Sequence, residues 1–152
     1  MNFKQVPTQV LPMKLLLEAD PSEACIRTYL DGAWGYVAES EVRGLTEIVG
    51  VCVVKPTSET NAELFNIAVD PCLHQRGIGS GLLQFVLDDV EQKGIREIAL
   101  GTGAFGYQLT FYQKYGFRVT GVIPDFFLDN YEDPIFENGL QHKDMLRLHK
   151  VF

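Results

Sequence analysis

The sequence predicts a mixed α/β fold in a single domain. Apolar runs typical of strands alternate with amphipathic segments typical of helices, and a strand, a helix and a second strand follow one another between residues 62 and 103. The composition is that of a globular protein, with 46% hydrophobic and 22% charged residues and no repeat. A chain of 152 residues is the size of one domain, so we expect that domain to cover residues 1–152.

Two short helices are expected near the N-terminus. Residues 12–20, PMKLLLEAD, have apolar residues at helical spacing. Residues 20–30, DPSEACIRTYL, begin with a pattern that resembles a capping box, in which Asp20 is the N-cap, Pro21 occupies the first helical position and Glu23 follows three residues after the cap. The acidic residues here therefore have a structural explanation.

Three strands should follow. Residues 33–40 and 47–56 predict an antiparallel hairpin that turns around Gly44. Residues 62–71, AELFNIAVDP, predict a third strand. Its apolar residues run nearly without interruption over 64–69, which is typical of a strand covered on both faces.

The next segments predict a crossover unit. Residues 79–94 place apolar side chains on one helical face, and Gly94 ends the helix. Residues 96–103, REIALGTG, predict a strand, and the length of the connection indicates that it runs parallel to the strand before the helix.

The last third contains a helix, a strand and a closing strand. Residues 107–117 predict a short helix that stops at Gly116, and residues 117–123 predict the next strand. An aromatic and acidic loop follows, and the alternating residues 144–152, DMLRLHKVF, predict the closing strand.

The glycine-rich stretch HQRGIGSG, residues 74–81, points to binding of a phosphate group. Glycine lets backbone amides approach a ligand, and the helix that follows contributes its positive N-terminal end. A dinucleotide fingerprint and a P-loop both require a residue other than Leu82 at a key position, so neither fits. A loop whose amides face a diphosphate, such as that of coenzyme A, fits without a metal or a lysine.

Charge and residue content exclude several functional classes. A net charge of −7 without clustered Lys and Arg argues against nucleic acid. The three cysteines form no CxxC pair, which favours reduced thiols and a cytoplasmic protein. No segment is apolar over the ~18 residues of a membrane helix. The three histidines lack metal-ligand spacing, so we expect no metal.

Two motifs in order resemble those of one family. The stretches LFNIAVDPCLHQRGIGSGLL and LTFYQKYGFR, about a third of the chain, are similar to the GNAT superfamily of acyl-CoA-dependent N-acetyltransferases. The resemblance implies a mostly antiparallel sheet of about seven strands, with a splayed parallel central pair and about four flanking helices. It also implies acetyl-CoA as co-substrate.

The resemblance further implies the cofactor contacts. Main-chain groups of Ile67, Ala68 and Val69 hydrogen-bond pantetheine as an added strand does. The loop signature starts with Gln or Arg where this chain has His74, so the role of that side chain is left open. The remaining implied cofactor-binding residues are Gln75, Arg76, Gly77, Ile78, Gly79 and Ser80.

The second motif departs from the family pattern as well. The family often has Asn and Ala upstream of the Tyr, at places that Phe105 and Gln108 occupy here. A side-chain contact from that Asn to pantetheine is therefore lost or replaced.

The implied reaction is direct attack of an amine on the thioester. Tyr112 matches the position of the family's general acid, near the thioester sulfur. The base is open: Glu63 is a candidate but is also a typical solvated strand end, and a water relay or binding of the neutral amine needs no base. A route through an acetylated Cys72 is a less direct alternative.

The acceptor is expected to be a small-molecule or protein amine. Residues 125–137 combine acidic and aromatic side chains, which either line a pocket for a cationic amine or form a solvated loop. A homodimer remains open. The alternative function is a non-catalytic acyl-CoA-binding sensor.

Overall fold

The structure is a computed structural model that describes residues 1–152. It divides into two compact units, Met1–Ile95 and Arg96–Phe152. The single domain expected over residues 1–152 remains a prediction.

The first unit contains four strands paired in chain order, each antiparallel to the next. The predicted hairpin is confirmed, but its turn consists of only Arg43 and Gly44, both with positive φ (54° and 78°). Two residues with positive φ form the hairpin turn that matches strand twist, so the strands extend further than expected. The strands are β1 (Asn2–Val6), β2 (Trp34–Val42), β3 (Leu45–Pro56) and β4 (Asn61–Val69).

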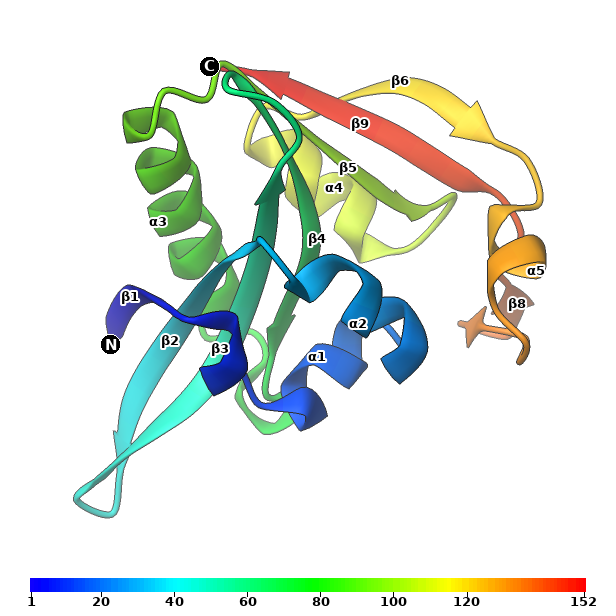
Figure 1. Ribbon diagram of the computed structural model, residues 1–152. Coiled ribbons are helices and arrows are strands. Elements are labelled where there is room, and N and C mark those ends of the chain that lie inside the picture. Colours follow the sequence, from blue (N-terminus) through cyan, green and yellow to red (C-terminus); the bar gives the residue numbers. More distant parts are fainter. The chain divides into compact units, whose positions relative to one another are not determined.

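Helices cover both faces of this sheet, with α1 and α2 on one face and α3 on the other (Figure 1). The five apolar side chains at helical spacing in α3, from Leu82 to Val90, are all buried, as predicted. The helical elements are η1 (Thr8–Val10), α1 (Met13–Ala19), α2 (Glu23–Leu30), η2 (Pro71–Leu73) and α3 (Ile78–Gln92).

Burial along β4 alternates. Its even-numbered positions Ala62, Leu64, Asn66 and Ala68 are buried, while the residues between them are partly or fully exposed. The face toward α1 and α2 belongs to an apolar cluster that includes Leu16 and Ala68. The opposite face is only partly covered, so the expectation of a strand covered on both faces is wrong for that face.

The expected capping box at α2 is wrong. The N-cap is Ser22, whose Oγ accepts a hydrogen bond from the backbone N–H of Cys25 (3.1 Å). Asp20 instead ends α1, and its Oδ1 accepts from the N–H of Ser22 (3.2 Å). Aspartate readily bonds the backbone two residues ahead, and this local turn delays the start of α2.

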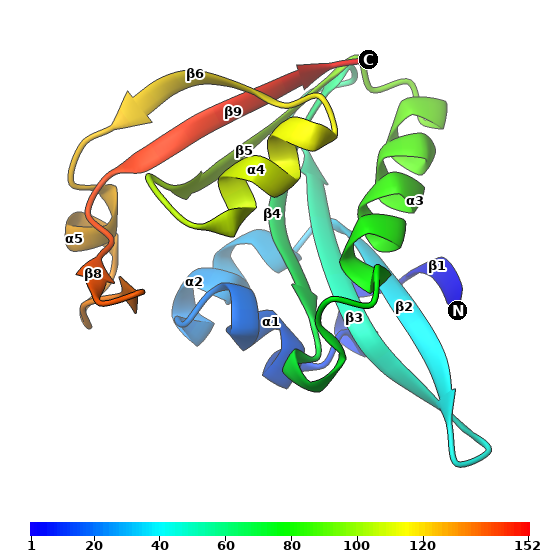
Figure 2. The same ribbon diagram turned by 180° about the vertical axis from the view of Figure 1, so that it is seen from behind.

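The second unit contains a three-stranded antiparallel sheet in which β9 lies between β5 and β6 (Figure 2). Seven strands of five residues or more thus occur in the chain, four in the first unit and three in the second. The elements of the second unit are β5 (Glu97–Gly103), α4 (Tyr107–Lys114), β6 (Arg118–Ile123), α5 (Phe126–Asn130), β7 (Phe136–Glu137), β8 (Leu140–Gln141) and β9 (Met145–Val151).

The segment expected as a loop contains α5 and the β7–β8 hairpin. The hairpin turns at Asn138 and Gly139, which have φ values of 54° and 77°. An Asn-Gly pair is a strong signal for such a turn. The sequence therefore held a hairpin signal that our interpretation did not use.

Candidate active site

The glycine-rich loop joins η2 to α3 with an irregular backbone. Gln75 and Gly77 both have left-handed φ values (64° and 78°) and flank Arg76. Gly77 is the N-cap of the 15-residue α3, and no side chain caps that helix. The first amides of a helix lack intrahelical partners and carry its positive dipole end, so this loop presents an anion-binding geometry.

Glycine is present at the three positions of the loop for different structural reasons. A Cβ on Gly77 meets nothing within 4 Å, so Gly77 is needed for its positive φ. A Cβ on Gly79 reaches only Val69, at an ordinary 3.6 Å. A Cβ on Gly81 falls 2.7 Å from the ring of Phe3, so Gly81 makes room for β1. Packing within the protein therefore leaves Gly77 and Gly79 open to a ligand.

His74 has a structural contact. Its Nε2 lies 3.0 Å from the backbone oxygen of Val69, and since a carbonyl oxygen only accepts, Nε2–H is the donor. This bond closes the loop back onto the end of β4. His74, which stands where the family signature has glutamine or arginine, therefore has a structural role in this loop.

The strand β4 carries the other implied cofactor contacts. Ile67, Ala68 and Val69 pair with β3, and within the first unit β4 has a partner on that side only. The register shifts by one residue at Phe65, which forms a β-bulge. Bulges are frequent beside active sites because they redirect neighbouring groups.

A buried polar network lies next to this bulge. Asn66 donates through Nδ2 to the backbone oxygen of Leu16 (3.0 Å) and to the hydroxyl of Tyr29 (3.1 Å), and Tyr29 donates to Asp20 (3.0 Å). Burial raises the pKa of Tyr29 well above its ordinary value, so its hydroxyl stays protonated. Flipping the amide would place oxygen against oxygen at Leu16, so Oδ1 of Asn66 is the atom left without a partner.

Tyr112 lies in the second unit, on α4. Its side chain is buried, and its ring packs edge-on against that of Phe117, with 5.9 Å between centroids. Gly116 takes the positive φ (95°) expected at the end of this helix. Glu63, the candidate base, lies in β4 of the first unit and is partly buried.

The acidic and aromatic residues of the tail separate into two groups. Glu132 and Asp133 are exposed. Asp125 is the N-cap of α5, and its backbone N–H is held by the carboxylate of Asp144 (2.9 Å). Glu137, by contrast, is partly buried and contacts His142, which the sequence analysis considered only as a metal ligand.

His142 is at the centre of an aromatic cluster. Its ring stacks on Phe105 at 4.0 Å and 5°, and the ring of Phe127 lies 5.7 Å away. Its Nε2 lies 2.9 Å from Oε1 of Glu137. The Asn138 and Gly139 turn was the sequence signal that places these residues together, because it fixes the hairpin register.

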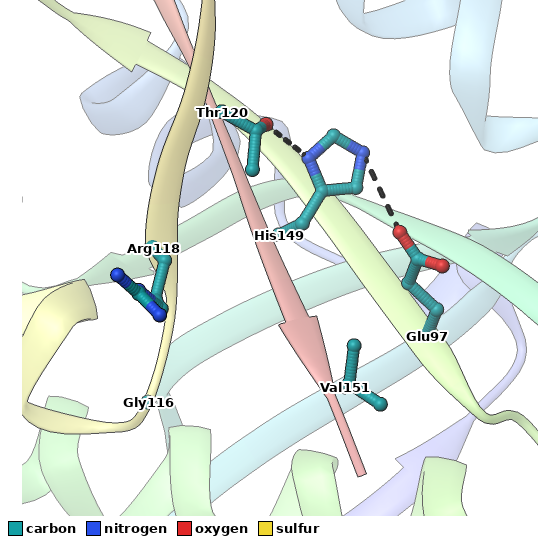
Figure 3. Close-up of a pocket in the computed structure, with 6 residues that line it drawn as sticks. All are labelled: Glu97, Gly116, Arg118, Thr120, His149 and Val151. Atoms are coloured by element: carbon teal, nitrogen blue, oxygen red, sulfur yellow. Dashed lines mark hydrogen bonds and ion pairs between the residues drawn. The ribbon is translucent and has the colours of Figure 1, made fainter.

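A separate hollow of about 560 Å³ lies in the second unit, over β5, β6 and β9 (Figure 3). Within it, His149 contacts Thr120 through Nδ1, and its Nε2 lies 3.8 Å from Oε1 of Glu97. The hydroxyl of Thr120 also lies 3.3 Å from the backbone oxygen of Arg147. None of the expected site residues lines this hollow, which also includes Gly116, Arg118 and Val151.

No three or more His, Cys, Asp or Glu side chains come together in a group able to hold a metal ion. None of the helices combines the length and the apolar character needed to span a membrane.

Comparison with known proteins then identifies the family. The sequence profile described as an acetyltransferase (GNAT) domain matches residues 31–119. The chain belongs to the GNAT acetyltransferase family. It is accordingly an enzyme of the N-acetyltransferase class, and its mixed α/β fold, mostly antiparallel with one parallel pair of strands, is the expected one.

Three relatives illustrate how far the likeness to this GNAT chain extends. The uncharacterized N-acetyltransferase YvbK of Bacillus subtilis is 39% identical over 136 residues, which cover 89% of this chain and 85% of YvbK. The structure of an IAA acetyltransferase from Bacillus cereus has 36% identity and a TM-score of 0.92, with 99% of each chain covered.

The third relative carries a cofactor. It is a GNAT family acetyltransferase from Elizabethkingia anophelis, whose crystal structure has acetyl-CoA bound. It is 37% identical to this chain, with a TM-score of 0.89 and 99% of each chain covered. The cofactor expected from the sequence is thus the one bound in a related structure.

Proposed function

We propose that this GNAT acetyltransferase moves the acetyl group of acetyl-CoA to a primary amine by direct attack within a ternary complex. The observation that carries the proposal is the uncapped start of α3 behind a loop with two left-handed residues, Gln75 and Gly77. Such a start binds a diphosphate through backbone amides alone. The relative with acetyl-CoA bound supports the choice of ligand.

The cofactor residues follow from this geometry. The diphosphate lies at the amides from Gly77 to Ser80, and Arg76, which is exposed, supplies positive charge beside it. Pantetheine adds as a strand along the edge of β4 opposite β3, through main-chain groups of Ile67, Ala68 and Val69. Gln75 and Ile78 hold the loop and the first helical turn in shape.

The reaction needs a neutral amine and a proton for the leaving thiolate. The amine nitrogen forms a bond to the thioester carbon and the carbon–sulfur bond breaks, while Tyr112 donates its phenolic proton to sulfur. The attacking nitrogen releases a proton to solvent, and solvent returns a proton to Tyr112. The reaction therefore consumes no net proton. Because an alkyl amine has a pKa of ~10.4 and a thiol one of ~8.5, deprotonation of the amine is the harder of the two steps.

The test is calorimetric titration with acetyl-CoA followed by a thiol-release assay with a panel of amines. We expect binding of acetyl-CoA, no binding of NAD, and thiol release that depends on the amine. Absence of acetyl-CoA binding would contradict the proposal. Binding without thiol release on any amine would support the acyl-CoA sensor instead.

Tyr112→Phe is the variant that tests the proton donor. We expect kcat to fall by about a hundredfold, the size of a general acid contribution, with the Kd of acetyl-CoA unchanged. Tyr115→Phe is the control, because Tyr115 lies just after the same helix and packs edge-on against Phe111. Equal effects of both substitutions would remove Tyr112 from the mechanism.

A further inference from the structure

The β7–β8 hairpin brings Glu137 and His142 to the same face. Glu137 pairs with Leu140, and the backbone N–H of His142 bonds the oxygen of Ile135 (2.7 Å). Residues two apart on a strand share a face, so Glu137 lies diagonally across from His142. Nε2 of His142 then reaches Oε1 of Glu137 at 2.9 Å.

This contact leaves the carboxylate only partly satisfied. Glu137 has no Lys or Arg within ion-pair distance, and no donor bonds its Oε2. The carboxylate lies against Gly106, where a Cβ would fall 2.8 Å from Oε2, directly before α4. Its side chain is 29% exposed, so a ligand can reach it.

His142 shows a second unsatisfied atom. The residue is 8% exposed, and its buried Nδ1 has no hydrogen-bond partner. Because a carboxylate only accepts, Nε2–H of His142 is the donor to Glu137. Buried polar atoms are normally hydrogen-bonded, and this one lies against Gly103, so the bond from Nε2 to Glu137 is the one that orients the ring.

The surroundings favour positive charge. Residues 119–142 include five acidic side chains and no Lys or Arg. The ring of Phe105 stacks on His142, and that of Phe127 lies nearby. Aromatic rings beside a carboxylate are the environment in which proteins bind ammonium groups.

We propose that Glu137, held in place by His142 and flanked by Phe105 and Phe127, binds a protonated amino group of the acceptor. The acceptor is then a small molecule with two amino groups. A carboxylate keeps the amine it binds protonated, so the anchored nitrogen is not the nucleophile. The second nitrogen, in its neutral form, attacks the thioester. This inference rests on the proposed function and names its substrate class.

The experiment is calorimetric binding of putrescine, a diamine, and of butylamine, which has the same carbon chain and one amino group, to the full chain with acetyl-CoA omitted. We expect putrescine to bind more tightly than butylamine. Glu137→Gln should weaken putrescine binding about tenfold, because one charge-assisted contact is lost. The Kd values of putrescine and butylamine should then be similar. Glu132→Gln is the matched control: the same change at an exposed acid of the same segment should alter the Kd of putrescine less than twofold.

Two variants of His142 test its positioning role. His142→Gln keeps a donor where Nε2 lies and should retain most of the putrescine affinity, whereas His142→Phe keeps the stack and should lose it. Acetyl-CoA binding and thermal unfolding confirm that each variant is folded.

Equal putrescine affinity in wild type and Glu137→Gln, or no preference over butylamine, overturns the subsite. Neither result touches the proposed function, which stands or falls on acetyl-CoA binding and thiol release.

Discussion

Tyr29 shows at the residue scale how one hydroxyl connects distant parts of the first unit. It donates to Asp20 and accepts from Asn66, so α1, α2 and β4 meet at one phenol. Its ring also stacks on Phe65, the bulged residue of β4, at 4.9 Å and 9°. The positions of the bulge and of Asn66 therefore depend on this side chain.

Tyr29→Phe should lower the free energy of unfolding by about 1–2 kcal/mol, because Asp20 and Asn66 each lose a buried hydrogen-bond partner. Urea unfolding followed by far-UV circular dichroism measures the change. The control is Tyr107→Phe, since Tyr107 is 67% exposed, and it should stay within about 0.5 kcal/mol of wild type. An unchanged free energy of unfolding in Tyr29→Phe would show that the network does not stabilise the fold.

Asn66 and His142 mark the limit of residue-scale prediction. From the sequence, Asn66 had no assigned role and His142 was considered only as a metal ligand. Asn66 bonds Leu16, which lies 50 residues away in the sequence, whereas the partner of His142, Glu137, lies only five residues away across the β7–β8 turn. Pattern and spacing carry no information about a partner as distant as Leu16, whereas the glycine loop is local and was found, and the Asn138–Gly139 turn beside His142 is a local signal that was not used.

At the element scale, contacts of Asp89 near the C-terminal end of α3 attach this helix to the sheet of the first unit. Oδ2 of Asp89 accepts from the hydroxyl of Tyr36 on β2 (2.6 Å) and lies 2.8 Å from Nζ of Lys93. Nζ of Lys93 also donates to Gln5 on β1 (2.9 Å). An acidic residue near a helix C-terminus opposes the helix dipole, so these contacts explain its presence.

Asp89→Asn should reduce stability at neutral pH and weaken the acid dependence of unfolding. Although burial pushes its pKa upward, the bonds from Lys93 and Tyr36 hold the pKa of Asp89 below its ordinary value. A carboxyl with a lowered folded-state pKa stabilises the fold above its unfolded value of ~3.9 and loses that effect as the pH falls through the folded value. The difference from wild type should therefore be about 1 kcal/mol at pH 7 and shrink below pH ~3.9.

Urea unfolding across this pH range measures the effect, and Asp88→Asn is the control. Asp88 is an exposed neighbour whose contact is with Gln84 on the same helix. A pH-independent difference between Asp89→Asn and wild type would mean that the lowered pKa does not contribute.

Helices and strands could be predicted from the sequence where the apolar pattern extends over many residues. The apolar face of α3 and the alternation of β9 both appeared in the sequence, and both elements lie within two residues of the expected bounds. The capping box failed because Ser22 and Asp20 compete for the same backbone groups. The short strand β1 and the helix α5, of five residues each, carry too few periodic positions to be recognised.

At the scale of the whole molecule, the sequence predicted the GNAT acetyltransferase family, and the match over residues 31–119 confirms it. The site residues remain proposals, because the loop and β4 belong to the first unit and Tyr112 to the second. The central claim is that the start of α3 holds the diphosphate of acetyl-CoA.

The most direct measurement is the Kd of acetyl-CoA for Gly77→Ala and Gly44→Ala. Both glycines have φ of 78° and nothing within 4 Å of an added Cβ, so both changes carry a similar backbone strain, about 1–2 kcal/mol. Gly44 is in the β2–β3 turn and Gly77 caps α3. We predict at least about a tenfold weaker Kd for Gly77→Ala and an unchanged Kd for Gly44→Ala. An unchanged Kd for both variants would contradict the account.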